Sequence, residues 1–385
     1  MNPTKTRRRS LSQSTPPSPI ETLISFDPDP SPNPNHSAES HDWSSLTDAA
    51  LHSVLSRLSS LEDFFAFRAV CRSWRSVPTT TPALSAQPPL LLVPRFPSFS
   101  ESFYDLLRRR LYSTRLPWSP PSRRSLAFSH GFLITISSAS ASGPSKLLLW
   151  NLLSGARIRL PKSPHRLPRV ILSSSPASSS PACSVVCFRP CSQSLQFCSL
   201  GDPLWKFHTF SNAPIIHDMI FFRGRLYALT PRCRLAAVDL VPRPEFTLLG
   251  PSIDPNSDDP GNKNYCKWTL AESGGNLLLV GTYLSMRFSV FRWDFEGGGW
   301  RALPDLGGRA LFLEDKGFAA SIVPTCPAVK GNCIYYADHR ESVYYEFSLE
   351  DRSRSTISLN PSISLPHHPG AHVPKIWVFP SLCCF

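Results

Sequence analysis

From about residue 88 onward the chain is a succession of short apolar runs separated by turn residues, and one composite unit recurs. It consists of an apolar run, a turn, a second run ending in Asp or Asn, another turn and a Leu-Pro pair, as at 151–161 and 294–304. Units about 40–50 residues apart that cannot each close a core are typical of propeller blades. The sequence therefore predicts a mainly β fold with a propeller of five or six blades and disfavours the alternative, a β-sandwich. Residues 103–107 are the main stretch with helical spacing.

Residues 42–75 have apolar side chains at helical spacing. Thr47 and Ser60 are the expected N-caps of two short helices. The apolar stripes are Leu51, Val54, Leu55 and Leu58 on the first helix, and Phe64, Phe67, Cys71 and Trp74 on the second. Helices this short cannot bury such stripes alone. They need a partner, which is either the rest of this chain or another protein.

Composition divides the chain into three parts. Residues 1–40 are rich in Pro and Ser, which predicts a disordered arm; residues 41–78 carry the two helices, and residues 79–385 form the β domain. The arginines at 7–9 suit nuclear import or an organelle transit peptide, although a solvated tail is favoured. The sequence has no run of about 18 apolar residues, which excludes a membrane span, and no N-terminal apolar signal sequence. The expected compartments are the cytoplasm, the nucleus or both.

The net charge of +12 is concentrated in one region. Residues 79–180 carry 13 basic side chains but only two acidic ones. Such a field attracts acidic protein, phosphate or nucleic acid. Nucleic acid is disfavoured because aromatic residues do not interleave with the basic ones, and a solvated face is the simplest interpretation. An acidic target would bind a basic mouth on one face of the propeller. The arginines that could reach such a face and form this mouth are Arg108, Arg109, Arg110, Arg123 and Arg124.

No catalytic, cofactor or metal site is expected from the sequence. The 11 cysteines are odd in number and include no Cys-x-x-Cys pair, which favours reduced thiols. Zinc and iron–sulfur sites usually need tighter spacing than that of Cys183, Cys187, Cys191 and Cys198. Phosphate-loop, nucleophile-elbow and zinc-protease motifs are lacking. A propeller enzyme would need acids or histidines that converge at one propeller mouth.

Three further groups of polar residues are expected in loops rather than in sites. The histidines at 367, 368 and 372 lie in a Pro- and Ser-rich stretch without a nearby acid or thiol. The carboxylate pairs at 258–259 and 314–315 are expected in solvated turns.

The helical segment resembles an F-box. In that family a Leu-Pro-x-Asp/Glu start leads to an Ile-x-x-Arg-Leu helix and an Arg-x-Val-Cys-Arg/Lys-x-Trp-Arg/Lys end. The matching positions here are Leu46, Asp48, Leu51, Val54, Arg57, Leu58, Asp63, Phe67, Arg68, Val70, Cys71, Arg72, Trp74 and Arg75. Thr47 departs from the family, which usually has Pro there. The alternative is an ordinary helical hairpin that packs on its own domain.

The C-terminal part is similar to plant F-box proteins with a kelch-like propeller of unknown function. The stretches that carry this resemblance are 300–313, 330–336 and 376–382, with Gly308 at a position where the family usually has an acid. The resemblance implies a substrate-receptor subunit of an SCF-type ubiquitin ligase, which is an adaptor and not an enzyme. The alternative is a propeller that binds acidic or nucleic-acid partners without a ligase role.

The implied partners are a Skp-family adaptor, through it a cullin, and an unknown target protein, with no cofactor and no membrane. The residues expected to bind the adaptor are Leu46, Leu51, Val54, Leu55, Leu58, Phe64, Phe67, Val70, Cys71 and Trp74.

Overall fold

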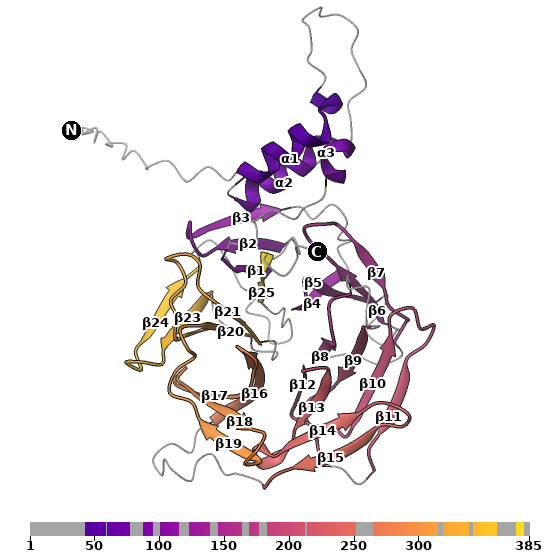
Figure 1. The fold of residues 1–385 in the computed structure, drawn as a ribbon, viewed down its shortest axis with the longest axis vertical. Coiled ribbons are helices and arrows are strands. Elements are labelled where there is room, and N and C mark those ends of the chain that lie inside the picture. Colours follow the sequence, from indigo (N-terminus) through magenta and orange to yellow (C-terminus); the bar gives the residue numbers. More distant parts are fainter. Residues whose placement is uncertain are drawn as a thin grey trace, which may run out of the picture.

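A cluster of short helices sits at one edge of a ring of six β-sheets (Figure 1). The computed structural model describes residues 43–58, 60–77, 88–94, 101–114, 123–138, 145–163, 169–176, 183–211, 214–251, 265–314, 319–338, 342–359 and 375–380. None of the helices within these ranges is long and apolar enough to cross a membrane.

The helices are η1 (Trp43–Ser45), α1 (Asp48–Arg57), α2 (Leu61–Ala69) and α3 (Arg72–Ser76). Both expected N-caps are confirmed. The Thr47 hydroxyl accepts a hydrogen bond from the Ala50 amide, and the Ser60 hydroxyl accepts one from the Asp63 amide at 3.0 Å. The second helix is not continuous as predicted, because Cys71 is extended (φ −160°) and separates α2 from α3.

Six sheets form the blades of a propeller, which confirms the mainly β prediction and excludes the sandwich. The strands are β25 (Ile376–Val378), β1 (Leu90–Pro94), β2 (Glu101–Asp105) and β3 (Arg110–Thr114) in blade 1; β4 (Arg123–Ser129), β5 (Phe132–Ser138), β6 (Ser145–Trp150) and β7 (Arg157–Arg159) in blade 2; β8 (Arg169–Leu172), β9 (Ser184–Phe188), β10 (Ser194–Ser199) and β11 (Lys206–Thr209) in blade 3; β12 (Asp218–Phe222), β13 (Arg225–Leu229), β14 (Leu235–Asp239) and β15 (Glu245–Leu249) in blade 4; β16 (Tyr265–Ser273), β17 (Asn276–Tyr283), β18 (Phe288–Asp294) and β19 (Gly299–Ala302) in blade 5; and β20 (Ala310–Glu314), β21 (Ala319–Ile322), β22 (Cys333–Ala337), β23 (Val343–Ser348) and β24 (Arg354–Ser358) in blade 6. A short 3₁₀ helix, η2 (Pro231–Cys233), joins β13 to β14.

Blade 1 closes the ring because it combines the two ends of the β domain. Its innermost strand, β25, pairs antiparallel with β1. Blade 6 holds β25 from the other side: the Trp377 amide donates to Glu314 Oε1 at 2.7 Å, and Trp377 Nε1 donates to the Leu313 carbonyl at 3.0 Å. Lys375 Nζ, just before β25, donates to the Val343 carbonyl at 3.1 Å.

Two predictions of local structure are wrong. Residues 103–107 do not form a helix, because Phe103 and Tyr104 lie on β2 between β1 and β3 and the turn begins after Asp105. Glu314 does not lie in a solvated turn: it is buried at the end of β20. Its neighbour at 315, the acids at 258–259 and the histidines at 367, 368 and 372 lie outside the described residues.

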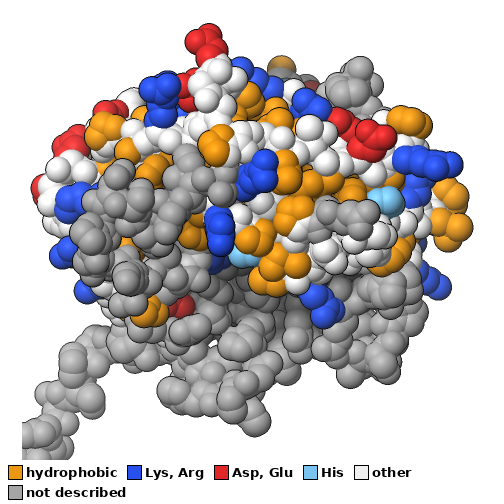
Figure 2. Space-filling view, turned by 90° about the horizontal axis from the view of Figure 1, so that it is seen from below, with side chains coloured by type: hydrophobic (Ala, Val, Ile, Leu, Met, Phe, Trp, Pro, Cys, Tyr) orange, Lys and Arg blue, Asp and Glu red, His pale blue; other side chains and the backbone are white. Residues whose placement is uncertain are grey.

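The side of the propeller that faces away from the helices has a mixed surface. Hydrophobic side chains there are interspersed with basic and acidic ones (Figure 2). Among the described residues in this view, no extended region carries a single charge.

Candidate adaptor-binding surface

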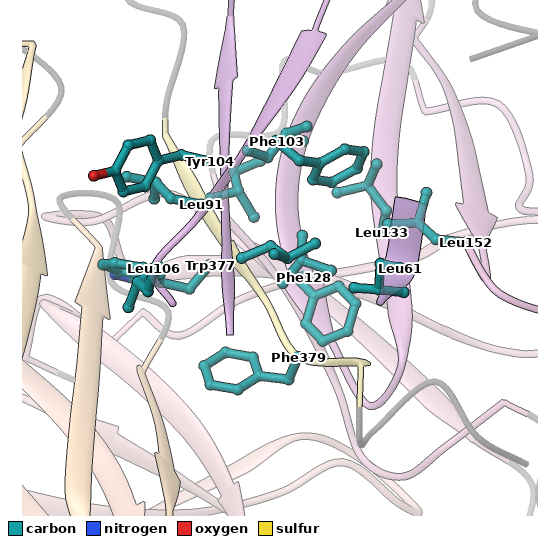
Figure 3. Packing of buried hydrophobic residues seen from close by; sticks show 14 of the residues in the cluster. Leu61, Leu91, Phe103, Tyr104, Leu106, Phe128, Leu133, Leu152, Trp377 and Phe379 are labelled. Carbon is teal, nitrogen blue, oxygen red and sulfur yellow. The ribbon is translucent and has the colours of Figure 1, made fainter. Parts of the chain in front are cut away.

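The inward face of the helices is part of the propeller's own core. The side chains of Leu51, Leu55, Phe64 and Phe67 are buried in one cluster with residues of blades 1 and 2. Leu61 at the start of α2 belongs to the same cluster (Figure 3). Burial of large apolar side chains is the main stabilising contribution to such an interface. The helices therefore pack against their own propeller.

Two specific contacts fix α2 on the propeller. The Phe65 ring stacks on Phe103 of β2, with centroids 6.5 Å apart. Arg68 Nη2 donates to the Ser154 carbonyl at 3.2 Å, in the turn between β6 and β7. Burial and the nearby charge of Arg75 lower the pKa of Arg68. Blade 1 thus contacts the middle of α2, and blade 2 contacts its end.

The outward face of the helices keeps apolar side chains accessible. Trp43 is 63% exposed, Val54 38% and Val70 52%. The Trp43 carbonyl accepts a hydrogen bond of 2.8 Å from Trp74 Nε1, and the Trp74 ring packs 4.7 Å from that of Phe67. Trp74 therefore links η1 to the buried face of α2, while Trp43 and Val70 remain open to a partner.

The structure divides the ten residues expected to bind the adaptor into three groups. The buried group is Leu51, Leu55, Phe64 and Phe67; the partly buried group is Leu46, Leu58, Cys71 and Trp74; the exposed group is Val54 and Val70. The first group is covered by this chain, so an adaptor that binds this conformation contacts the other two groups. Trp43 was not predicted, because it precedes the helical repeat that drew attention to the others.

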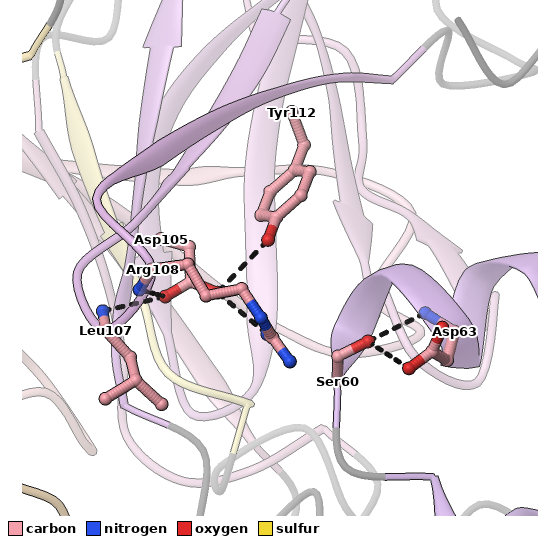
Figure 4. Close-up of polar contacts among 6 residues, drawn as sticks. All are labelled: Ser60, Asp63, Asp105, Leu107, Arg108 and Tyr112. Carbon is pink, nitrogen blue, oxygen red and sulfur yellow. Dashed lines mark hydrogen bonds and ion pairs between the residues drawn. The ribbon is translucent and has the colours of Figure 1, made fainter. Parts of the chain in front are cut away.

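The arginines at 108–110 form the turn between β2 and β3. Asp105 organises this turn: its Oδ1 accepts from the amides of Leu107 and Arg108 at 2.7 and 3.0 Å, and its Oδ2 pairs with the Arg108 guanidinium at 3.2 Å (Figure 4). An Asp that accepts bonds from the two or three following residues stabilises a tight turn. All three arginines are exposed.

The five arginines considered for the target do not lie together. Strands β2 and β25 both end beside the start of β1. The turn at 108–110, which follows β2, therefore lies at the same end of blade 1 as the last residue of the innermost strand, β25. Arg123 and Arg124 begin β4, the innermost strand of blade 2. Innermost strands of repeated blades run in one direction along the axis, so the two groups lie at opposite ends. The side chains of Arg123 and Arg124 lie outside the described residues.

The four closely spaced cysteines lie in blade 3. Cys183, Cys187 and Cys198 are buried as free thiols, whereas Cys191 is exposed in the turn after β9. Burial raises the pKa of Cys198 to about 12 and that of Cys187 well above its ordinary value. In the part of the chain that the structure describes, no three His, Cys, Asp or Glu residues form a group that could hold a metal ion.

Several solved structures are similar to this chain. TolB from Acinetobacter baumannii is 13% identical, with 77% of this chain and 69% of TolB covered at a TM-score of 0.43. A putative 6-phosphogluconolactonase from Bacteroides uniformis is 12% identical, with 70% and 95% covered at a TM-score of 0.40. No curated protein matches the sequence.

Two family models match the sequence, and together they cover both parts of the structure. The F-box domain model matches residues 43–81, and the KIB1-4 beta-propeller model matches residues 103–355, which is more than half of the chain. The chain therefore belongs to the KIB1-4 beta-propeller family and carries an F-box domain ahead of its propeller.

Proposed function

We propose that this chain is a substrate-receptor subunit of an SCF-type ubiquitin ligase. The F-box helices bind a Skp-family adaptor, which links the chain to a cullin, and the propeller binds the target protein. Ubiquitin transfer belongs to the partners. This chain contributes proximity and orientation, which raise the effective concentration of target lysines at the ubiquitin-conjugating enzyme. We place this function in the cytoplasm, the nucleus or both.

The observation that carries this proposal is the accessible apolar surface of the F-box helices. Trp43, Val54 and Val70 remain exposed although the opposite side of the same helices is buried on the propeller. A partner that covers them removes apolar area from water, which favours association. Because the helices and blades 1 and 2 share one core, the target is held at a set distance from the adaptor.

The adaptor surface is tested with V54E/V70E in the full chain. Both positions are exposed, so the variant keeps its fold while two carboxylates oppose an apolar contact. We expect Skp-family adaptor to co-purify with wild type and to be lost from V54E/V70E. The matched control is V241E, because Val241 is also exposed (78%) but lies just after β14 in blade 4. Equal recovery of adaptor by all three proteins would place the adaptor elsewhere.

The target is identified by affinity purification of the wild-type chain followed by mass spectrometry. A true target is expected to co-purify with both wild type and V54E/V70E, whereas adaptor and cullin co-purify with wild type alone. A protein that disappears together with the adaptor is part of the ligase and not a target.

We further propose that an acidic target contacts the arginines of the propeller. Because the two groups lie at opposite ends of their blades, they are reversed separately, as R108E/R109E/R110E and as R123E/R124E. We expect one of the two variants to lose the target and to retain the adaptor. The loss of target should be more complete at low salt, because salt screens the interaction between the charges. Target recovery that is indifferent to both variants and to salt would move the site to an apolar or acidic part of the propeller.

A further inference from the structure

Two segments that are distant in the chain and carry arginines come together where α2 adjoins blade 2. Arg68, Arg72 and Arg75 come from the helices, and Arg157 and Arg159 come from β7, the outermost strand of the blade. The contact that joins the two segments is the hydrogen bond from Arg68 to Ser154, three residues before Arg157. We call these five arginines the junction cluster.

Strand pairing places the β7 arginines on the side of blade 2 that shares a core with the helices. Arg157 pairs with Trp150, and Arg159 pairs with Leu148, across the β6–β7 ladder. Directly paired residues project on the same side of a sheet. Trp150 and Leu148 pack in the core cluster shared with the F-box helices, so Arg157 and Arg159 lie on that side too.

The cluster concentrates positive charge. Burial and the charge of Arg159 lower the pKa of Arg157, as burial and Arg75 do for Arg68. The acids of α2, Glu62 and Asp63, lie at the opposite end of that helix, and Asp63 is engaged by the Ser60 hydroxyl at 2.6 Å. Among the described residues on the far side of the propeller, basic side chains are interspersed with hydrophobic and acidic ones (Figure 2). The junction therefore favours an anionic partner.

The junction cluster adjoins the surface proposed for the adaptor. Val70, which is exposed, lies between Arg68 and Arg72 in the sequence, at the break between α2 and α3. A partner that covers Val70 is therefore brought beside the exposed arginines of α3. Arginine suits carboxylates because its planar guanidinium donates two parallel hydrogen bonds.

We propose that the junction cluster binds an acidic segment, rich in Asp or Glu, of the same adaptor that covers Val70. This inference rests on the proposed function. The adaptor then contacts the propeller as well as the helices, so that blade 2 contributes directly to adaptor binding. The predicted contact depends on Arg157 and Arg159, which lie far outside the F-box.

The test compares R157E/R159E with R287E/R292E in the full chain. All four positions are exposed, and both variants change the net charge equally, but Arg287 and Arg292 lie on blade 5. Two probes are used: purified Skp-family adaptor and a fluorescent peptide of eight glutamates. Binding is measured at low and high salt, and thermal melting checks the fold. R157Q/R159Q removes the charges without adding new ones.

We expect R157E/R159E to bind both probes about tenfold more weakly at low salt and R287E/R292E to bind them like wild type. R157Q/R159Q should lie between, and the differences should shrink at high salt. Equal binding of both probes by wild type, R157E/R159E and R287E/R292E would overturn the junction site, even if V54E/V70E loses the adaptor. If wild type binds the glutamate peptide but not the adaptor, and R157E/R159E loses the peptide, the junction cluster is an anion-binding site but the proposed ligase role is wrong.

Discussion

Blade 4 and blade 1 contain the same kind of sheet but are assembled in different ways. In blade 4 every strand from β12 to β15 pairs with the next one along the chain. In blade 1 the innermost strand comes from the C-terminal end, and the helices pack on the same blade from outside. Blade 4 is therefore specified by local sequence, whereas blade 1 depends on contacts between distant segments.

The difference matters because the F-box is attached to the blade that closes the ring. When distant segments pair, the chain loses loop-closure entropy before the favourable contacts of the pairing form. Blade 1 is therefore complete only when β25 is in place. Since the helices share its core, the orientation of the adaptor surface depends on ring closure.

The largest expected effect comes from Trp377→Ala in β25. Trp377 is fully buried, packs 5.0 Å from Phe312 and donates to the Leu313 carbonyl. Truncation of a buried Trp typically costs about 3–5 kcal/mol, and we expect chemical denaturation to show a loss of that size. The control is Trp268→Ala in contiguous blade 5, where the side chain is only partly buried. A smaller loss for Trp377 than for Trp268 would mean that closure contributes little.

Leu55→Ala tests whether the helices and the propeller unfold together. Leu55 is buried on α1 within the shared core, and truncation of such a leucine costs about 2–5 kcal/mol. We expect a single transition at lower denaturant when circular dichroism and tryptophan fluorescence are compared. Leu235→Ala in blade 4, which is equally buried, provides the reference for a loss inside the propeller. If the helical circular dichroism signal is lost at lower denaturant while the propeller transition is unchanged, the F-box unfolds as an independent module.

A chain that starts near residue 80 tests the domain boundaries, which remain a prediction. We expect it to lose the adaptor and to retain β structure, but to melt at a lower temperature, because Phe103 loses the cover that Phe65 provides. An unchanged melting temperature would show that the helices do not stabilise the propeller.

The thiols of blade 3 are expected to be reduced, metal-free and largely unreactive. At pH 8, a pKa of about 12 leaves roughly one Cys198 side chain in ten thousand as the reactive thiolate. Exposed Cys191 is expected to react first with iodoacetamide, followed by Cys187 and Cys198 only after denaturation. Peptide mass spectrometry measures the order. Stoichiometric zinc or iron by elemental analysis would contradict the prediction.

The smallest expected effect comes from the surface of blade 4. Arg225 and Asp239 form an ion pair of 2.9 Å in which both side chains are about half exposed. Exposed pairs contribute about 0.2–1 kcal/mol, so Arg225→Ala should lower the free energy of unfolding by no more than this. A loss comparable to that of Trp377→Ala would show that blade 4 also depends on more than its local hairpins.

Local patterns predicted the contiguous parts of the fold well. The recurring unit at 294–304 predicted a strand that ends in Asp and is followed by a turn, and β18 does end at Asp294 and pairs with β19 across that turn. The pattern failed at 103–107, where helical spacing was outweighed by pairing with strands on both sides. It also failed at Glu314, because a carboxylate beside an acidic neighbour suggests solvent unless its distant partner, the Trp377 amide, is known.

The sequence by itself determined the F-box helices and their caps, the recurrence of the blades and the excess of arginine at 79–180. These features arise from side chains a few residues apart, or from composition. The tertiary structure alone decided that Leu51 and Phe64 are buried in the core shared with the propeller while Val54 and Val70 are exposed, and that Arg68 of α2 bonds to Ser154 of blade 2. The physical reason is that these relations depend on how the closed ring positions segments that are distant in the chain, and periodicity along one segment carries no information about its partner.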